Sequence, residues 1–236
     1  METMRETTSN SGTQAQPRGE FFSRMRPEAL QDLASLEIRS SHVANECIFS
    51  EKDRARGIFI VLDGEVKLSI NSSDGRRLSL SIARKGEILG LASALTGVPY
   101  DVTAETLYPT KIAHVSRKEF LNFLTRHPEV YLTVTEELSR HVTMACEQLR
   151  TVGLSATAPE KLARLLLEWS HSGQTTECGT RFRFSLTHEE IGEFIGTSRE
   201  TVTRTLNTFK NRHLVAFQGS MVTIPSRTAL ESFAHA

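Results

Sequence analysis

A short stretch near the C-terminal end, residues 186–206 (LTHEEIGEFIGTSRETVTRTL), carries side chains that can bind a nucleic acid. At helical spacing, one face presents four side chains that can contact base edges: Arg199, Glu200, Thr203 and Arg204. Arginine can bond guanine O6 and N7 together, and glutamate can accept from the cytosine amino group. Hydroxyl groups near two predicted helix starts can donate to phosphates: Thr187, Ser198 and Thr201. The stretch therefore predicts contacts with the major groove of double-stranded DNA.

Two helices must hold these side chains, and the sequence marks the start of each. Thr187 with Glu190, three residues on, is typical of a capping box, and Thr197 with Glu200 predicts a second one after Gly196. The opposite, apolar face of the second helix consists of Val202, Leu206 and Phe209.

The segments around this helix pair predict a winged helix-turn-helix. Residues 160–170 have the pattern of an amphipathic helix, 181–186 that of a strand, and 214–225 that of a hairpin with a two-residue turn. Residues 197–227 also hold a local excess of four positive charges: Arg199, Arg204, Lys210, Arg212 and Arg227 against Glu200.

Each of these side chains also has a purely structural interpretation. Glu200 could cap its own helix or pair with Arg204 one turn later, and the arginines could be an ordinary solvated face. The DNA-binding hypothesis is favoured because the capped helices, the glycine turn, the basic face and the hairpin all agree.

Residues 41–116 predict a small antiparallel β domain. Short runs with alternating apolar residues cover 58–70 and 76–83, on either side of the turn signal Ser73-Asp74-Gly75. Glycines recur at the spacing expected of turns in a sandwich or barrel: Gly57, Gly64, Gly75, Gly86 and Gly90. Before this domain, residues 21–36 have the apolar spacing of a helix.

The stretch from Pro128 to Gly153 predicts a long helix with an apolar stripe. The stripe positions alternate in steps of four and three residues: Leu138, Val142, Ala145, Leu149 and Val152. A heptad stripe on a solvated helix favours pairing with a second helix over packing on its own domain. We therefore expect a homodimer that pairs through this dimer stripe.

The composition excludes several other classes. The 236 residues are 39% hydrophobic and 24% charged, and no apolar run approaches the roughly 20 residues of a membrane span. The 28 basic residues balance the 28 acidic ones, so a surface that binds a polyanion must be local. The polar residues 1–20 have no signal-peptide core, which predicts a disordered tail and a cytoplasmic location without membrane association. The sequence has no catalytic motif, and we expect no enzyme activity.

The pattern E-I-G-x-x-I-G-x-S-R-E-T-V-x-R, from Glu190 to Arg204, resembles the helix-turn-helix of the CRP/FNR family of bacterial transcription regulators. Residues 58–68 and 86–90 resemble that family's effector-binding roll, and the long helix lies where the family dimerises. The resemblance implies an α+β chain with a β-roll of the cyclic-nucleotide-binding type, a double-stranded β-helix or jelly roll. It divides the chain into a tail (1–20), the roll (21–125), the dimerisation helix (126–154) and the winged helix-turn-helix (155–236).

The resemblance also implies partners. Base reading falls to Arg199, Glu200 and Arg204, on a two-fold symmetric DNA site, and an activator of this family would also contact RNA polymerase. An alternative is a regulatory or scaffolding module that binds a small molecule and no longer binds DNA. The effector, the target genes and the choice between activation and repression stay open.

The resemblance places an effector pocket in the roll, where the cyclic-nucleotide branch holds the ribose and the cyclic phosphate. The corresponding positions are Gly90-Leu91, Tyr100-Asp101 and, on the long helix, Cys146-Glu147. Leu91 cannot accept from a ribose hydroxyl, and Asp101 would repel a phosphate, whose burial requires a cation or several donors. We therefore expect an effector other than cyclic AMP.

Other sensor chemistry has little support in the sequence. The three cysteines, Cys47, Cys146 and Cys178, lie far apart and none is in the N-terminal tail, so we expect no iron–sulfur cluster and no other metal site. We interpret Cys146 as a buried or half-buried thiol, with redox sensing as the alternative. Haem ligation by His114 or His141 has no supporting motif.

Overall fold

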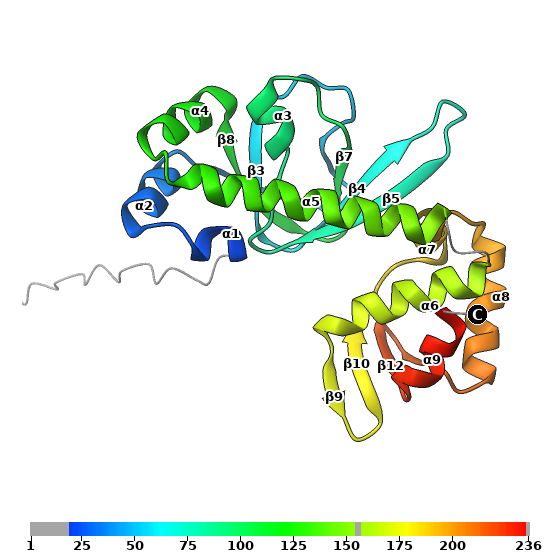
Figure 1. Ribbon diagram of the computed structural model, residues 1–236. Helices are drawn as coiled ribbons and strands as arrows, with labels where there is room; N and C mark the ends of the chain where they lie inside the picture. The colour runs from blue at the N-terminus through cyan, green and yellow to red at the C-terminus, as the bar shows by residue number, and fades with distance from the viewer. Residues whose placement is uncertain (1–18, 154–156, 235–236) are drawn as a thin grey trace, which may run out of the picture.

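The computed structural model describes residues 19–153 and 157–234, so the predicted tail falls almost wholly outside the described residues. The N-terminal half is a roll of two four-stranded antiparallel sheets, ordered β1-β8-β3-β6 and β2-β7-β4-β5 (Figure 1). The strands are β1 (Ile38–His42), β2 (Cys47–Phe49), β3 (Gly57–Asp63), β4 (Glu65–Asn71), β5 (Arg77–Arg84), β6 (Ile88–Leu89), β7 (Thr103–Thr106) and β8 (Thr110–Ser116). The predicted jelly-roll architecture is confirmed.

The chain passes from one sheet to the other at Gly64, between β3 and β4. Gly64 has φ 93°, and a Cβ there would lie 2.5 Å from Thr110 Oγ1, so both backbone conformation and space require glycine. β4 and β5 then form the predicted hairpin, with Val66 opposite Ala83 and Leu68 opposite Ser81 on the inner face. Inside the roll, Phe49 stacks on Tyr100 with ring centroids 4.1 Å apart.

Short helices cover the outer side of the sheet that contains β3. They are α1 (Glu20–Ser23), α2 (Pro27–Ser35), α3 (Leu91–Thr96) and α4 (Arg117–Arg126). The prediction of one helical segment over 21–36 is wrong, because the chain breaks at Arg26, whose ψ is 151°. Pro27 disfavours helical backbone in the residue before it, and it serves as the first residue of α2 instead.

The long helix α5 (Val130–Gly153) crosses the roll and ends beside the C-terminal module, as Figure 1 shows. Its first two turns are held by the roll, where Val130 and Val134 are buried in the same core cluster as Phe120 and Phe123. Further along, the predicted dimer stripe is open, with Val142 64% and Leu149 68% exposed.

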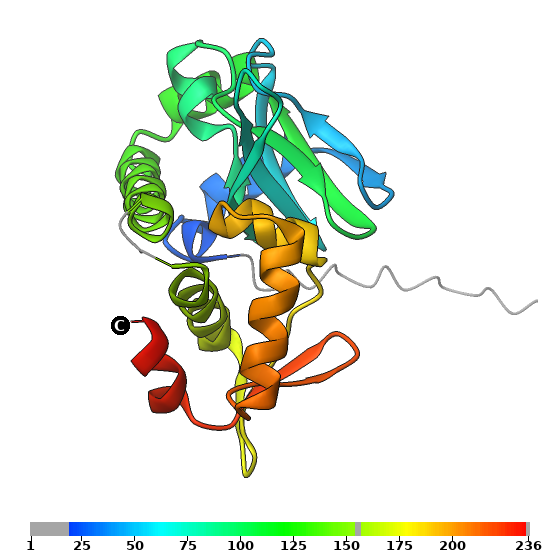
Figure 2. The ribbon, with the colours of Figure 1, turned by 90° about the vertical axis from the view of Figure 1, so that its right-hand side faces the viewer.

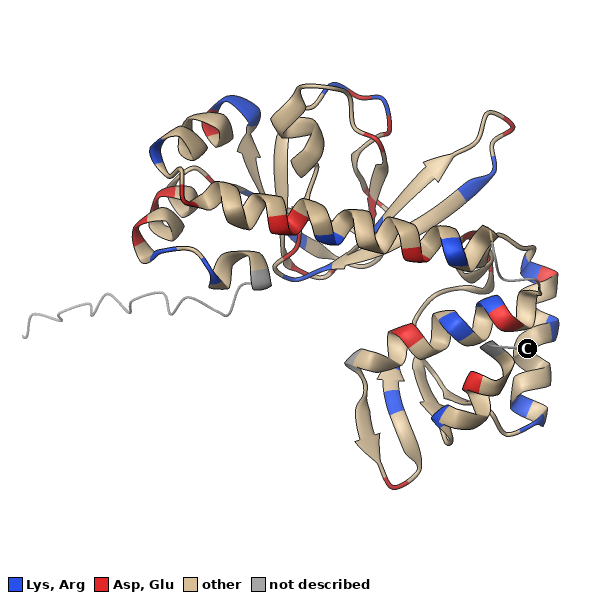
Figure 3. Ribbon diagram, in the orientation of Figure 1, with Lys and Arg blue, Asp and Glu red and all other residues tan. Residues whose placement is uncertain are grey.

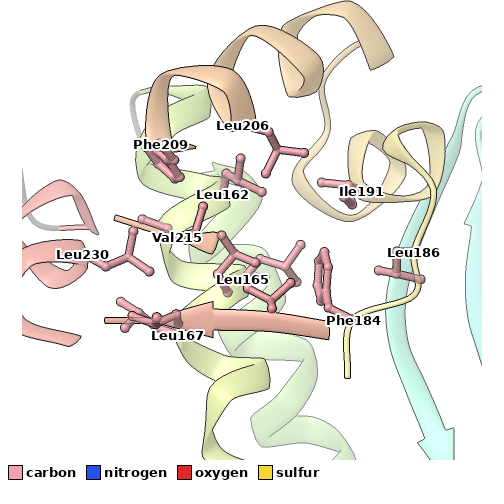
Figure 4. Packing of buried hydrophobic residues seen from close by; sticks show 14 of the residues in the cluster. Leu162, Leu165, Leu167, Phe184, Leu186, Ile191, Leu206, Phe209, Val215 and Leu230 are labelled. Carbon is pink, nitrogen blue, oxygen red and sulfur yellow. The ribbon is translucent and has the colours of Figure 1, made fainter. Parts of the chain in front are cut away.

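The C-terminal module is a winged helix-turn-helix, as predicted. It comprises α6 (Ala158–Trp169), the short 3-10 helix η1 (Ser170–Ser172), β9 (Gln174–Thr176), β10 (Gly179–Arg183), α7 (His188–Ile195), α8 (Arg199–Asn211), β11 (Ala216–Gln218), β12 (Met221–Ile224) and α9 (Arg227–Ala234). Its sheet is ordered β11-β12-β10-β9. The apolar faces of α6, α7 and α8 meet in one core, where Leu162, Ile191 and Leu206 are buried (Figure 4).

Two elements of this module are not anticipated by the sequence patterns. β9 is fully exposed and polar, so it has no alternation of buried and exposed residues to reveal it. α9 packs on the module through Leu230, and Phe233 makes an edge contact with Phe209. Figure 2 shows α9 beside α6, on the side of the module away from the hairpin of β11 and β12.

Among the described residues, no helix is long and apolar enough to span a membrane. Cys47, Cys146 and Cys178 are all free and exposed. The expectation that Cys146 is at least half-buried is wrong, because its position on α5 faces away from the roll.

Candidate DNA-binding surface and effector cavity

The first helix of the pair, α7, begins at the predicted capping box. Thr187 Oγ1 accepts from the Glu190 backbone N–H at 3.2 Å, and Glu190 Oε2 accepts from the Thr187 backbone N–H at 2.9 Å. Because the Thr187 hydroxyl also donates to Glu190 Oε2 at 3.0 Å, it is engaged in the cap. A phosphate contact by this hydroxyl would replace that bond.

Glycines set the tight turn between α7 and α8. Gly196 ends α7 in the left-handed region, with φ 63° and ψ 46°. Gly192 lets the turn pack closely, since a Cβ there would lie 2.7 Å from the Thr197 carbonyl oxygen. The Thr197 N–H donates back to the Gly192 carbonyl at 2.9 Å, which fixes the angle between the helices.

The second helix, α8, is capped by Ser198, so the predicted capping box of Thr197 and Glu200 is wrong. Ser198 has extended backbone angles, and its Oγ accepts from the Thr201 N–H at 3.3 Å. Thr197 lies one residue too early to cap α8, in the turn where its N–H donates to the Gly192 carbonyl. Glu200 still lies in the first turn, where hydrogen bonds from its own backbone N–H and the Ser198 hydroxyl lower its pKa.

The proposed base-reading side chains lie on the outer face of α8. Arg199, Glu200 and Arg204 are exposed, whereas Thr203 is half-buried. The Thr203 hydroxyl donates to the Arg199 carbonyl at 2.9 Å and lies 2.8 Å from His188 Nδ1. The structure therefore presents three of the four candidates to solvent and ties the fourth to α7.

His188 is a residue of this surface that the sequence analysis missed. It is the first residue of α7 and lies beside the base-reading face through its contact with Thr203. The available signal was its place directly after the capping Thr187, at a helix start where anions bind.

The remaining phosphate candidates lie at the start of α8. Ser198 Oγ and Thr201 Oγ1 are 3.2 Å apart, and Thr201 Oγ1 accepts from Arg204 Nη2 at 3.2 Å. Arg204 is thereby oriented along the first turn of α8, in position to reach either a phosphate or a base.

Fewer basic residues share one face in the folded chain than the count over residues 197–227 suggests. Basic residues recur along α8 in Figure 3, and Lys210 lies over the Phe217 ring of the wing at 4.7 Å. Arg227, counted with this patch from the sequence, is engaged elsewhere: it donates to Ser170 Oγ at 2.6 Å and to Glu231 Oε1 at 3.2 Å. It braces α9 against η1, so the folded chain removes it from the basic face.

A cavity of about 370 Å³ opens between the inner face of β4 and β5, the β6–α3 segment and α5. Four of the predicted effector-pocket residues line it: Gly90, Leu91, Tyr100 and Asp101. Cys146 and Glu147 do not; Glu147 lines a separate hollow beside Trp169. On α5 the wall is formed instead by Leu138, His141, Val142, Met144 and Ala145.

Burial shifts the pKa of two groups on the cavity wall, Glu87 and His141. Desolvation raises the pKa of Glu87, although a backbone hydrogen bond from Arg84 and the charges of Arg84, Arg140 and His141 oppose the change. Desolvation and the Arg140 charge lower the pKa of His141, whose Nε2 lies 3.0 Å from Glu137 Oε1. Both changes favour the neutral forms inside the cavity.

The other histidine considered for haem, His114, lies away from this wall. Its ring packs 4.8 Å from Phe59, and burial lowers its pKa. Among the residues that the structure describes, no group of three or more His, Cys, Asp or Glu side chains is placed to hold a metal ion.

The outer face of the same two strands contacts the winged helix-turn-helix module. Lys67 Nζ on β4 lies 3.2 Å from Glu193 Oε2 and 3.6 Å from Glu190 Oε1 on α7. Ser79 Oγ on β5 also donates to Glu193 Oε2, at 3.0 Å. We call these four residues the docking cluster.

The end of α5 joins this docking cluster to the cavity. Gln148 Nε2 donates to the Ser79 carbonyl at 2.9 Å and to the Phe194 carbonyl at 2.8 Å. Met144, one turn earlier on α5, lines the cavity. A change in cavity shape therefore has a short path through α5 and β5 to α7.

Known proteins resemble the chain over both halves. Residues 160–233 match the Crp-like helix-turn-helix domain, and residues 39–127 match the cyclic nucleotide-binding domain. The CRP-like cAMP-activated global transcriptional regulator of Mycobacterium tuberculosis is 25% identical over 208 residues, which cover 88% of this chain and 92% of that protein. The transcriptional activatory protein AadR of Rhodopseudomonas palustris is 27% identical over 185 residues, 77% of this chain and 76% of that protein.

Solved structures agree on the fold. FixK2 from Bradyrhizobium japonicum has a TM-score of 0.75 and 22% sequence identity, with 85% of this chain and 98% of that chain covered. The match extends over the roll, the long helix and the winged module together.

Proposed function

The chain belongs to the CRP/FNR family of bacterial transcription regulators, and on that premise we propose that it binds a two-fold symmetric operator as a homodimer. An effector in the cavity of the roll controls this binding. The observation that carries the proposal is the exposed face of α8, where Arg199, Glu200 and Arg204 stand on a helix whose start and entry turn are both fixed.

The open dimer stripe on α5 supports the homodimer. Val142 and Leu149 expose most of their side chains in the single chain, and Tyr131, 48% exposed, extends the same face toward the start of the helix. Apolar residues at heptad spacing are stabilised when a second helix covers them. Two such modules would place their recognition helices about one turn of DNA, roughly 34 Å, apart.

Contacts on both faces of β4 and β5 support control by an effector. The inner face lines the cavity through Leu68, Leu80 and Ser81, and the outer face carries the docking cluster. A ligand with different affinities for two arrangements of these strands would shift the position of α7, and with it α8.

An operator selected from random or genomic DNA tests this function. We expect a two-fold symmetric sequence in selected fragments, bound by the full chain in a mobility-shift assay. Arg199→Ala should weaken binding by about 1 to 3 kcal/mol and relax the preference at one base pair per half-site, because a bidentate contact to guanine is lost.

Lys111→Ala is the matched control for charge. Lys111 is exposed on β8 of the roll, so this substitution removes one positive charge at a place away from α8. Uniform weakening of all operator variants by Arg199→Ala, with base preference unchanged, would contradict base reading. If no fragment binds above the nonspecific level, the regulatory hypothesis itself is wrong.

A further inference from the structure

We propose that the cavity between the roll and α5 takes a neutral, largely apolar ligand that carries one hydrogen-bond donor, such as a medium-chain alcohol, and not an anion. The inference rests on the proposed function in treating this cavity as the effector site. The juxtaposition that carries it is a largely apolar wall that holds no lysine or arginine among the described residues, with the carboxyl group of Glu87 and the imidazole of His141 set into it.

Most of the described residues that line the cavity are apolar. Side chains from the roll and from α5 contribute to it: Phe49, Leu68, Leu89, Leu91, Val102 and Leu138. None of the described residues that line the cavity is lysine or arginine. A buried anion needs a cation or several oriented donors, so an anionic ligand would lose its hydration here without compensation.

The arginines nearest to Glu87 are already partnered. Arg84 Nε donates to Glu65 Oε1 at 3.3 Å, and its guanidinium lies 5.0 Å from the centroid of the Trp169 ring. Arg140 pairs with Glu137. Neither arginine lines the cavity, and moving one into it would break these contacts.

Two hydroxyl groups on the wall, those of Tyr100 and Ser93, are already engaged within the roll. The Tyr100 hydroxyl donates to the Gly57 carbonyl at 2.9 Å and accepts from the Arg56 and Gly57 N–H groups. The Ser93 hydroxyl donates to the Pro99 carbonyl at 3.1 Å. Both are committed to holding the roll together.

Glu87 contributes a carboxyl group to a lining that also contains His141 and Ser81, and this carboxyl group selects a hydrogen-bond donor on the ligand. Ionised or neutral, its carboxyl group can accept a hydrogen bond from a ligand hydroxyl or N–H group. At a pH where Glu87 is ionised, a carboxylate ligand would face this second carboxylate and the exposed Asp101. The charge pattern selects a donor and rejects a negative group.

The cavity wall and the dimer stripe share residues on α5. Val142 and Ala145 belong both to the cavity wall and to the dimer stripe. A partner helix laid on the stripe would cover the opening, and the bound ligand would then be enclosed by apolar surface from both copies. An enclosed apolar ligand is retained because its return to water is unfavourable.

A displacement titration on the full chain tests the ligand class. N-phenyl-1-naphthylamine, a neutral apolar fluorophore with one N–H donor, is bound first and then displaced by 1-octanol, by octanoate or by cyclic AMP. We expect 1-octanol to displace it at a concentration at least tenfold lower than octanoate does, and cyclic AMP not to displace it at millimolar concentration.

Two variants assign the effect to this cavity. Glu87→Gln removes the negative charge and keeps an acceptor, so the preference for 1-octanol over octanoate should shrink severalfold. Glu147→Gln is the matched control, because Glu147 lies on α5 outside the cavity, and it should leave the preference unchanged. Met144→Trp fills the cavity from α5 and should weaken fluorophore binding at least tenfold.

Equal or tighter displacement by octanoate or cyclic AMP would overturn the inference. So would fluorophore binding that Met144→Trp leaves unchanged in a chain that circular dichroism shows to be folded. These readouts need no DNA, and they separate the two proposals: alcohol binding without operator binding removes the proposed function alone, whereas operator binding without alcohol binding removes this inference alone.

Discussion

Replacing Lys67 should release the DNA-binding module from the roll. The Lys67 side chain is 5% exposed, and it contacts Glu190 and Glu193, whose side chains are 18% and 20% exposed. Lys67→Met keeps the length and apolar contacts of the lysine stem but leaves two neighbouring carboxylates without their cation. Because these carboxylates sit on α7, they can regain water only if α7 moves away from β4.

The size of the effect follows from burial and distance. At an effective dielectric constant of about 20, an ion pair at this distance attracts by about 5 kcal/mol, and desolvation of the buried ammonium offsets much of that. Removing one partner of a buried pair costs about 3 to 5 kcal/mol. The partial exposure of both carboxylates favours the lower end, so we expect docking to weaken by about 3 kcal/mol, roughly 100-fold.

Trp169 reports on this docking because it is the one tryptophan of the sequence and lies under the Arg84 guanidinium of β5. We expect Lys67→Met to shift its emission to longer wavelength and to speed hydrogen exchange in β4, β5 and α7. Adding Glu193→Gln to Lys67→Met should restore part of the docking, since it removes one of the two unpaired charges. The exposed Lys111→Met is the control on the same roll.

Unchanged emission and unchanged exchange in Lys67→Met would refute the reasoning. An equal response in Lys111→Met would also refute it, because the effect would then follow from net charge and not from the docking cluster.

Three further outcomes are expected. Val142→Glu places a charge in the dimer stripe and should convert the expected dimer to a monomer, as measured by sedimentation. Glu147→Gln, on the same helix, is the control and should leave the protein dimeric. A dimer in both variants would exclude this stripe as the interface. Gly196→Ala should lower the free energy of unfolding by about 1 kcal/mol in urea titrations, because φ is 63° and the new Cβ meets Val152 Cγ1 at 3.3 Å; no loss would contradict the strained turn. Burial raises the pKa of Glu87. The contribution of this carboxyl group to the free energy of unfolding is therefore fully present below its ordinary pKa of 4.5, and it is lost as the pH rises through the raised pKa. Glu87→Gln should therefore be more stable than the wild type at pH 7, with the gain disappearing below pH 4.5, and a gain independent of pH would argue against burial as its cause.

Short-range rules in the sequence were enough to predict the helix-turn-helix. The capping box at Thr187, the turn at Gly196 and the apolar face of α8 all depend on residues within a few positions of one another. The alternation in β4 and β5 likewise predicted the hairpin, in which the apolar Val66 and Ala83 lie opposite each other on the inner face of the roll. The cap of α8 was misplaced by one residue, since Thr197 and Ser198 carry equivalent hydroxyls and only the turn onto Gly192 distinguishes them.

Contacts between distant residues were decided only by the tertiary structure. Arg227 looked like part of the basic patch until its bonds to Ser170 and Glu231 placed it on α9. The family resemblance placed Cys146 and Glu147 in the effector pocket. In the structure, His141 and Met144 of α5 line the cavity instead. The burial of Lys67 against α7 depends on residues more than a hundred positions away in the chain. The sequence by itself determined the local geometry of the helix-turn-helix, because capping and periodicity act within one or two helical turns. The ligand cavity and its link to the DNA-binding module required the fold, because packing brings together side chains whose separation in the chain carries no signal.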